Sequence, residues 1–277
     1  MTDTRAPYRR VRVARVGRAA AGSADDVAAA EEPLEVRLHG RSFAVIMRTP
    51  GADRELAAGF LLSESVIRTY DDIGAVEHCR HPDHPEVHNV VDVYLTGEAA
   101  GALDARLEQR RNILTSSSCG LCGRVTIDSL RLSAAPLRGS ERMDWMLAAS
   151  LPQRLRERQA VFDETGGLHA AGLFTMDGDC EAAAEDVGRH NAVDKVIGAR
   201  LLDDRVPLTG RALLVSGRAS FEIVQKAWLG GVAIVGAVSA PSSLAIELAE
   251  EAGITLLGFV RDGGFNLYTH PARILGV

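Results

Sequence analysis

Three apolar runs in the last third of the chain place the strongest constraint on its fold. They cover residues 212–216, 232–238 and 254–260, and the segments 220–228 and 242–252 between them have the apolar spacing of helices. Strands that are apolar throughout and alternate with helices are typical of βαβ units, whose parallel sheet is covered on both faces. The pattern therefore predicts an α/β lobe with parallel sheet strands at the C-terminal end of the chain.

The first part of the chain has shorter strand signals and predicts a smaller, strand-rich α+β lobe. Residues 34–38 and 42–47 are strand-like and are joined by a predicted tight turn at 39–40. Asp53 is expected to cap a helix that runs to about Val66. Other expected elements are two short strands within 77–95, helices over 99–111, 141–160 and 186–197, and a short strand over 172–175.

These patterns divide the chain into four segments. Residues 8–16 alternate between apolar and basic side chains and predict a strand, whereas 17–32 are rich in small and acidic residues and predict a loose linker. The four segments are a flexible or strand-forming part at 1–32, an N-terminal lobe at 33–115, a mobile loop at 116–124 and a C-terminal lobe at 125–277.

Composition argues against several classes of protein. With 31 basic and 37 acidic residues the net charge is −6, which argues against nucleic acid as a partner. Four cysteines are too few for a disulfide scaffold. No apolar run reaches the ~20 residues that span a bilayer and no secretory signal is visible, so we expect a cytoplasmic protein. Only Lys195 and Lys226 are lysines, which leaves two candidates for a lysine nucleophile.

Two of the cysteines, Cys119 and Cys122, stand three positions apart in the sequence Ser-Ser-Ser-Cys-Gly-Leu-Cys-Gly over 116–123. Small, flexible neighbours leave both thiols accessible, and Arg124 favours the thiolate. Sulfur carriage through a persulfide, thioredoxin-like redox chemistry, a zinc site and two incidental thiols all remain open. Sulfur or redox chemistry is favoured over zinc, because the sequence has no second CxxC pair.

The loops after the three apolar runs have a composition suited to anionic ligands. They cover 216–220, 239–243 and 261–264, and all three should lie at one edge of a parallel sheet. Two of them enter helix N-termini, where free N–H groups favour phosphate, and Arg218 and Arg261 can bind phosphate or carboxylate. A nucleotide or another phosphorylated ligand is one interpretation, and ordinary capping and turn residues are the other.

Histidines mark two further segments. His169 follows a glycine-rich turn at 165–167, in a setting that resembles the His-x-Glu motif of zinc deaminases. Ala171 stands at the glutamate position, so a deaminase-like shape is compatible with the sequence but deaminase chemistry is not expected. The histidine-rich loop 78–88 is similar to a metal loop, although its irregular spacing favours an exposed turn.

The run 185–191 carries more polar side chains than the start of a helix requires. Within it, Asp186 can accept hydrogen bonds from a purine base and Arg189 can bind phosphate, while capping and salt bridges are the alternative. Cys79 and Cys180 are expected to be bystanders.

Several motifs together resemble the FdhD family, the formate dehydrogenase accessory and sulfur carrier proteins. The string Glu-Asp-Val-Gly-Arg-His-Asn-Ala-Val-Asp-Lys is highly specific for this family, whereas a lone CxxC is not. The matching segments span most of the chain from about residue 30 and are 55–64, 118–123, 165–174, 185–195, 216–218 and 258–270.

The resemblance implies a function and a set of site residues. Members of the family are implied to carry sulfur from a cysteine desulfurase to a molybdenum cofactor with two guanine dinucleotides, which formate dehydrogenase needs for activity. By resemblance, Cys119 matches the persulfide carrier and Cys122 its partner. A cytidine-deaminase-like C-terminal lobe and a homodimer are also implied. The segment that matches the cofactor-binding stretch of the family consists of Phe259, Val260, Arg261, Asp262, Gly263 and Gly264.

The residue patterns and the resemblance lead to one hypothesis, a sulfur carrier that holds this cofactor as cargo and needs no permanent metal. Two alternatives are a cofactor-binding chaperone without sulfur transfer and a zinc-dependent deaminase-like hydrolase. Beyond the stretch at 259–264, the expected contacts with a guanine-nucleotide-type ligand are Ser216, Arg218, Asp186, Arg189 and His169.

Overall fold

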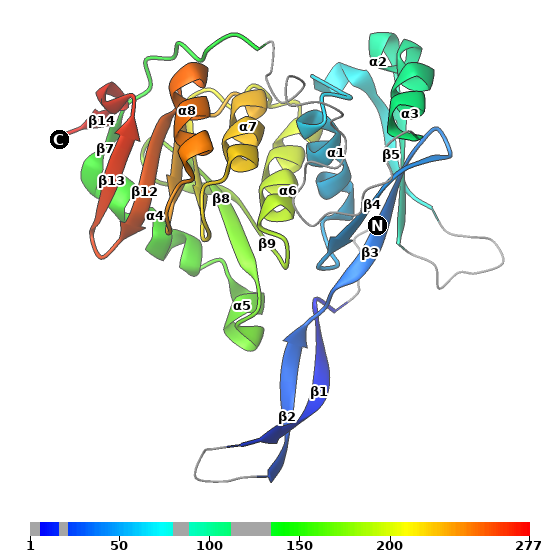
Figure 1. The fold of residues 1–277 in the computed structure, drawn as a ribbon, viewed down its shortest axis with the longest axis horizontal. Coiled ribbons are helices and arrows are strands. Elements are labelled where there is room, and N and C mark those ends of the chain that lie inside the picture. Colours follow the sequence, from blue (N-terminus) through cyan, green and yellow to red (C-terminus); the bar gives the residue numbers. More distant parts are fainter. Residues whose placement is uncertain (1–5, 17–21, 80–88, 112–133) are drawn as a thin grey trace.

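The computed structural model describes residues 6–16, 22–79, 89–111 and 134–277. Within these ranges the chain forms a larger sheet and a smaller sheet, with a row of helices running from one to the other (Figure 1). The loop predicted at 116–124 lies outside the described residues. No helix in the part that is described is long and apolar enough to cross a membrane.

The larger sheet has six strands in the order β13-β12-β11-β10-β8-β9. At its centre, β10 (Arg211–Val215), β11 (Ile234–Ala237) and β12 (Thr255–Arg261) pair in parallel, which confirms the prediction from the three apolar runs. The remaining strands pair antiparallel with their neighbours and are β8 (His169–Thr175), β9 (Cys180–Asp186) and β13 (Gly264–Thr269).

Both faces of this sheet are covered, which explains why its central strands are apolar throughout. Leu213 and Val215 of β10 belong to the larger apolar cluster, whereas Ala212 and Leu214 belong to a smaller cluster on the other face. This alternation follows from the two-residue repeat of a strand. Against these two faces pack α4 (Trp145–Arg156) on the side of the smaller cluster, and α6 (Arg189–Leu202), α7 (Phe221–Gly230) and α8 (Ser243–Ala252) on the other side.

The smaller sheet has four strands in the order β4-β3-β6-β5. Its β3 (Glu32–Leu38) and β4 (Arg41–Arg48) form the predicted hairpin, and His39 and Gly40 in the turn have φ of 50° and 77°. Two positive φ values are what a two-residue hairpin turn requires. The other elements of this lobe are η1 (Tyr70–Asp72), β5 (Ile73–His78), β6 (Val90–Leu95), α2 (Gly97–Gly101) and α3 (Leu103–Arg111).

Helix α1 (Asp53–Ser63) joins the two lobes because it packs against α6 almost backbone to backbone. A Cβ atom added at Gly59 would lie 2.0 Å from the carbonyl oxygen of Asp194, and one added at Gly198 would lie 1.9 Å from that of Glu55. Only glycine allows such an approach. The larger apolar cluster contains residues of both lobes, so the lobes share one core.

Two predicted helix starts differ from the structure. The N-cap of α1 is Ala52, and Asp53 is instead the first residue of the helix, buried in an ion pair with Arg48. The helix expected from residue 186 begins at Arg189, because Asp186 still belongs to β9 and its side chain accepts from the backbone N–H of the following turn. In both places a carboxylate that suggested a helix start binds a buried partner in the interior.

A two-stranded ribbon projects from the body (Figure 1). It consists of β1 (Tyr8–Arg15), as predicted, and β2 (Gly22–Ala29), which pairs with β1 along its whole length. The loose linker expected over 17–32 is therefore wrong for β2, because small and acidic residues form a strand when a neighbouring strand satisfies their backbone groups. The remaining elements are β7 (Met143–Asp144), α5 (Ala160–Thr165), η3 (Pro271–Arg273) and β14 (Ile274–Leu275).

Candidate functional site

The loops after β10 and β11 meet at one edge of the larger sheet, as the sequence predicts, and residue Phe259 of β12 lies beside them. Ala219 and Pro241 form an isolated parallel bridge between the first two loops. The backbone N–H of Ser239 donates to the carbonyl of Gly217 (3.3 Å), and that of Phe259 donates to the carbonyl of Ser239 (3.2 Å). These bonds hold the first two loops side by side and fix the second against β12.

His169 reaches the same edge because β8 runs antiparallel to β10 and starts where β10 ends. The next residue, Ala170, exchanges two bonds with Ser216: its N–H donates to the Ser216 hydroxyl, and its carbonyl accepts from the Ser216 N–H, each at 2.9 Å. The Ser216 hydroxyl therefore fastens the loop to β8. A Cβ added at Gly217 would lie 3.5 Å from Nδ1 of His169 and 3.6 Å from Cδ of Arg189, so the backbone at this glycine closely approaches both side chains.

The surroundings of His169 lower the pKa of its imidazole, which favours the neutral form. Burial lowers its pKa below the ordinary value, and the nearby Arg189 and His190 lower it further, against a smaller opposing effect of Asp186. A neutral imidazole offers one donor and one acceptor nitrogen, which suits a polar ligand or proton transfer.

Arg189 brings a partly buried cation to this edge. Its Nε atom is buried and has no hydrogen-bond partner among the described residues. A buried guanidinium nitrogen without a partner is costly unless something else accepts from it. An anion at the sheet edge could supply such an acceptor, and the phosphate contact predicted for this residue stays a prediction.

Sequence reasoning missed a third polar group at this edge, His190 with its partners on α7. Its Nε2 lies 3.1 Å from Oγ of Ser220 and 2.6 Å from Oε2 of Glu222. Both contacts use the same ring nitrogen, so this is not a serine–histidine–acid relay, in which the acid binds the other nitrogen. The arrangement instead fixes the start of α6 against the start of α7. The polarity of the run at 185–191 was the only signal for it.

The stretch at 259–264 divides into buried and exposed parts. Val260 is fully buried in the smaller cluster and packs the sheet, while Arg261 is exposed and its Cζ lies 5.4 Å from the centre of the Phe259 ring. Phe259 has φ of 52°, a left-handed conformation that costs a non-glycine residue about 1–3 kcal/mol and is enriched at functional sites. The segment after Arg261 is the turn between β12 and β13, formed by Asp262 and Gly263, with Gly264 as the first residue of β13.

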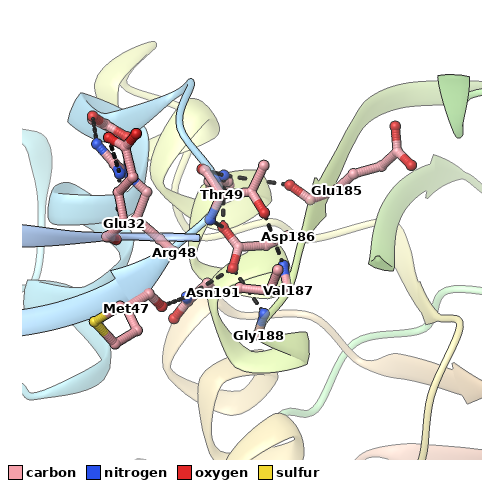
Figure 2. A network of polar contacts seen from close by, with 11 residues as sticks. Glu32, Met47, Arg48, Thr49, Glu185, Asp186, Val187, Gly188 and Asn191 are labelled. Atoms are coloured by element: carbon pink, nitrogen blue, oxygen red, sulfur yellow. Dashed lines mark hydrogen bonds and ion pairs between the residues drawn. The ribbon is translucent and has the colours of Figure 1, made fainter. Parts of the chain in front are cut away.

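Asp186, predicted as a ligand contact, faces the protein interior (Figure 2). Its Oδ1 accepts from the backbone N–H of Gly188 (2.8 Å) and from Nδ2 of Asn191 (2.9 Å). Its Oδ2 accepts from the backbone N–H of Thr49 (3.1 Å) and lies 2.7 Å from Nζ of Lys195. Both oxygens are thus occupied and the residue is fully buried, so the geometry does not support a direct ligand contact.

The two lysines, candidates for a nucleophile, are both buried in ion pairs, Lys195 with Asp186 and Lys226 with Asp194. Neither has the open position of a reactive amine. Arg218, in contrast, is exposed on the loop after β10, where a ligand at the edge can reach it.

Cys119 and Cys122 lie outside the described residues, so their predicted roles stay predictions. Cys79 and Cys180 are free and partly buried, and burial is the main cause that raises the pKa of each thiol. A raised pKa keeps a thiol protonated and weakly nucleophilic, which agrees with their expected place as bystanders. The described residues contain no cluster of three or more His, Cys, Asp or Glu side chains placed to hold a metal ion.

Comparison with known proteins covers nearly the whole chain. A sequence model described as the FdhD/NarQ family matches residues 29–275. The chain is 47% identical over 274 residues to the sulfur carrier protein FdhD of Streptomyces avermitilis, covering 96% of this chain and 95% of that protein. It is 44% identical over 270 residues to the protein of the same name from Sulfurisphaera tokodaii, covering 96% and 99% of the two chains.

The fold also has a counterpart among solved structures. The crystal structure of a proposed formate dehydrogenase accessory protein from Desulfotalea psychrophila matches with a TM-score of 0.74. The match covers 98% of this chain and 100% of the other at 24% sequence identity, and it supports the mixed α/β architecture described above.

Proposed function

The chain belongs to the FdhD/NarQ family, and from that premise we propose that it is a sulfur carrier that serves a formate dehydrogenase. Sulfur is taken from a cysteine desulfurase and delivered to a molybdenum cofactor with two guanine dinucleotides, which binds as cargo at the edge of the larger sheet. The observation that carries the ligand site is the buried, unpartnered Nε of Arg189 beside the loop at Gly217.

Several groups at this edge suit the phosphates of such a cargo. The loops after β10 and β11 lead into α7 and α8, whose first N–H groups favour anions. The exposed guanidinium groups of Arg218 and Arg261 can form paired bonds to phosphate oxygens. Neutral His169 adds a donor or acceptor without adding charge. An anionic ligand therefore meets complementary groups although the whole chain carries a net charge of −6.

The sulfur step proceeds by thiol exchange at the CxxC pair. The Cys119 thiolate attacks the outer sulfur of the desulfurase persulfide, the S–S bond there breaks, and the desulfurase thiolate leaves. Cys122 then attacks the inner sulfur on Cys119 and hydrosulfide departs to the metal of the cargo. The remaining Cys119–Cys122 disulfide is returned to the dithiol by an external thiol reductant, which balances the two electrons.

Mass spectrometry after incubation with a cysteine desulfurase and cysteine tests the carrier. The wild-type peptide that contains Cys119 should gain one sulfur atom, about 32 Da. Cys119→Ala should lose this label, and Cys180→Ala, a matched change at a bystander, should keep it. Equal labelling of Cys119→Ala would show that another residue carries the sulfur. A Cys119→Ala, Cys122→Ala variant that still activates formate dehydrogenase would instead indicate a cofactor-docking protein without sulfur transfer.

Calorimetry with GDP tests the ligand site. Wild type should bind, and Arg189→Gln should weaken binding at least about tenfold because a charge-assisted contact to phosphate is lost. Arg211→Gln is the matched control, since Arg211 stands at the opposite end of β10 and pairs with Glu181. The absence of heat from wild type at millimolar GDP would exclude the proposed nucleotide site.

A further inference from the structure

The turn between β9 and α6 is built around the side chain of Asp186. Only Val187 and Gly188 separate the last residue of β9 from the first residue of α6. Both Gly188 and Asn191 donate to Oδ1 of Asp186. A Cβ added at Gly188 would lie 2.8 Å from Nδ2 of Asn191, so the turn leaves little room for a side chain at this position. Its conformation therefore depends on buried polar bonds.

Thr49, from the other lobe, completes this turn (Figure 2). Its backbone N–H donates to Oδ2 of Asp186 (3.1 Å), its hydroxyl accepts from the N–H of Val187 (3.2 Å), and its carbonyl accepts from Nζ of Lys195 (2.9 Å). Asn191 adds a bond to the carbonyl of Met47 (2.8 Å). Three groups of one buried residue thus bind three positions around the start of α6.

Thr49 is itself held firmly in the N-terminal lobe. The preceding residue, Arg48, is fully buried and forms two bonds with Asp53, from Nε at 2.8 Å and from Nη2 at 2.7 Å. The same guanidinium donates to Oδ1 of Asn89 (3.0 Å) and to the carbonyl of Glu32 (3.3 Å). The bonds of Arg48 and Thr49 therefore connect the N-terminal lobe to the turn between β9 and α6.

The residues after this turn are the ones that face the ligand edge. Arg189 follows Gly188 directly and its side chain lies beside Gly217, and the ring of His190 contacts the hydroxyl of Ser220. A small rotation of the turn would move both side chains together, because they share its backbone. We propose that Thr49 and Asp186 are positioning residues, which set Arg189 and His190 for the ligand without touching it. This inference rests on the proposed ligand site at this edge.

The test uses two changes that add no charge and remove one buried hydroxyl each. Thr49→Val removes the acceptor for the Val187 N–H, whereas Ser63→Ala removes the hydroxyl that donates to Asp194 (2.7 Å) in the neighbouring helix contact. Both variants should lower the melting temperature by similar amounts. Only Thr49→Val should weaken GDP binding, by roughly tenfold, with Ser63→Ala within about twofold of wild type.

A conservative variant separates positioning from general loss of structure. Thr49→Ser keeps the hydroxyl and should bind GDP within about twofold of wild type, even if loss of the methyl group lowers the melting temperature. Wild-type affinity in Thr49→Val, together with a lowered melting temperature, would overturn the proposal and leave Thr49 as a stabilising residue only.

A second measurement does not depend on GDP. The pKa of the His169 imidazole, followed by NMR, is lowered in part by the nearby charge of Arg189. If Thr49 positions Arg189, the pKa of His169 should rise toward its ordinary value in Thr49→Val and stay unchanged in Ser63→Ala. An unchanged His169 titration in both variants would overturn the positioning role. If wild type binds no GDP but the pKa of His169 still rises in Thr49→Val, the proposed ligand is refuted and the positioning role of Thr49 is supported.

Discussion

The chain has only two lysines, and each is buried against an aspartate at 2.7 Å, yet the two pairs do different things. Lys195 also donates to two backbone carbonyls, those of Thr49 (2.9 Å) and Glu185 (3.3 Å). Lys226 forms both of its bonds with the carboxylate of Asp194. The first pair therefore fixes the course of the backbone, and the second joins side chains.

Their positions in the fold explain this difference. The Lys195–Asp186 pair stands where β9 turns into α6, one turn away from groups that face the ligand edge. The Lys226–Asp194 pair stands inside the helix layer, where the hydroxyl of Ser63 on α1 also bonds to Asp194. The same kind of ion pair thus supports the geometry of the proposed site in Lys195–Asp186 and the packing of three helices in Lys226–Asp194. Variants of the two pairs should separate stability from binding.

The largest effect is expected from Asp186→Asn. Each carboxylate oxygen accepts from two donors, so an amide group in either orientation would place its NH₂ against two other donors. It would also leave Lys195 buried without an opposite charge. We expect a loss of about 3–5 kcal/mol of unfolding free energy and loss of GDP binding. Urea unfolding and calorimetry measure the two effects, and full GDP affinity in a folded variant would contradict the division between the pairs.

Lys226→Met should cost a little less, about 3 kcal/mol, and leave GDP binding within about twofold. It leaves Asp194 buried without its cation, although the Ser63 hydroxyl still donates to it. The flexible methionine side chain can occupy most of the space of the lysine stem. Urea unfolding gives the stability, and calorimetry gives the affinity. A strong loss of GDP affinity here would mean that the helix layer also sets the site.

Gly198→Ala tests the close contact of α1 with α6, the helix that carries one residue of each pair. The new Cβ would lie 1.9 Å from the carbonyl oxygen of Glu55, so α1 and α6 would have to separate. We expect a loss of about 2 kcal/mol from this overpacking, measured by urea unfolding. Gly101→Ala is the matched control, because nothing lies within 4 Å of its added Cβ. Equal stability of the two variants would show that the close approach of α1 and α6 contributes little.

The parallel centre of the larger sheet and the meeting of two of its loops could be predicted from the sequence because both depend on local patterns. Apolar runs separated by helices imply parallel strands, and parallel strands end at a common edge, which brings 216–220 and 239–243 together. The ribbon strand β2 could not be predicted in this way, because its stability comes from pairing with β1 and its composition is that of a loop.

The division of the polar run at 185–191 into inward and outward side chains could not be read from the sequence. Asp186 and Arg189 are both polar residues near a helix start, but Asp186 binds Thr49, which is 137 positions away. The link from His190 to Ser220 spans 30 positions. A run of polar residues indicates that its side chains form hydrogen bonds. Whether the partner is another part of the protein or a ligand depends on contacts between distant parts of the chain.

The smallest effect is expected at a half-exposed pair that contrasts with both buried ones. Arg211 donates to Glu181 through Nε (2.5 Å) and Nη2 (2.8 Å), and this bonding is the main cause that lowers the pKa of Glu181 below its ordinary value. A carboxyl whose pKa is lowered by folding stabilises the fold above its unfolded pKa, and this stabilisation is lost as pH falls through the folded value.

Because solvent screens the ion pair of Glu181 with Arg211, Glu181→Gln should cost at most about 0.5 kcal/mol of unfolding free energy at neutral pH. In urea unfolding, the difference from wild type should shrink with added salt and vanish in acid below the lowered pKa. A cost as large as that of Lys226→Met would show that burial is not what separates these pairs.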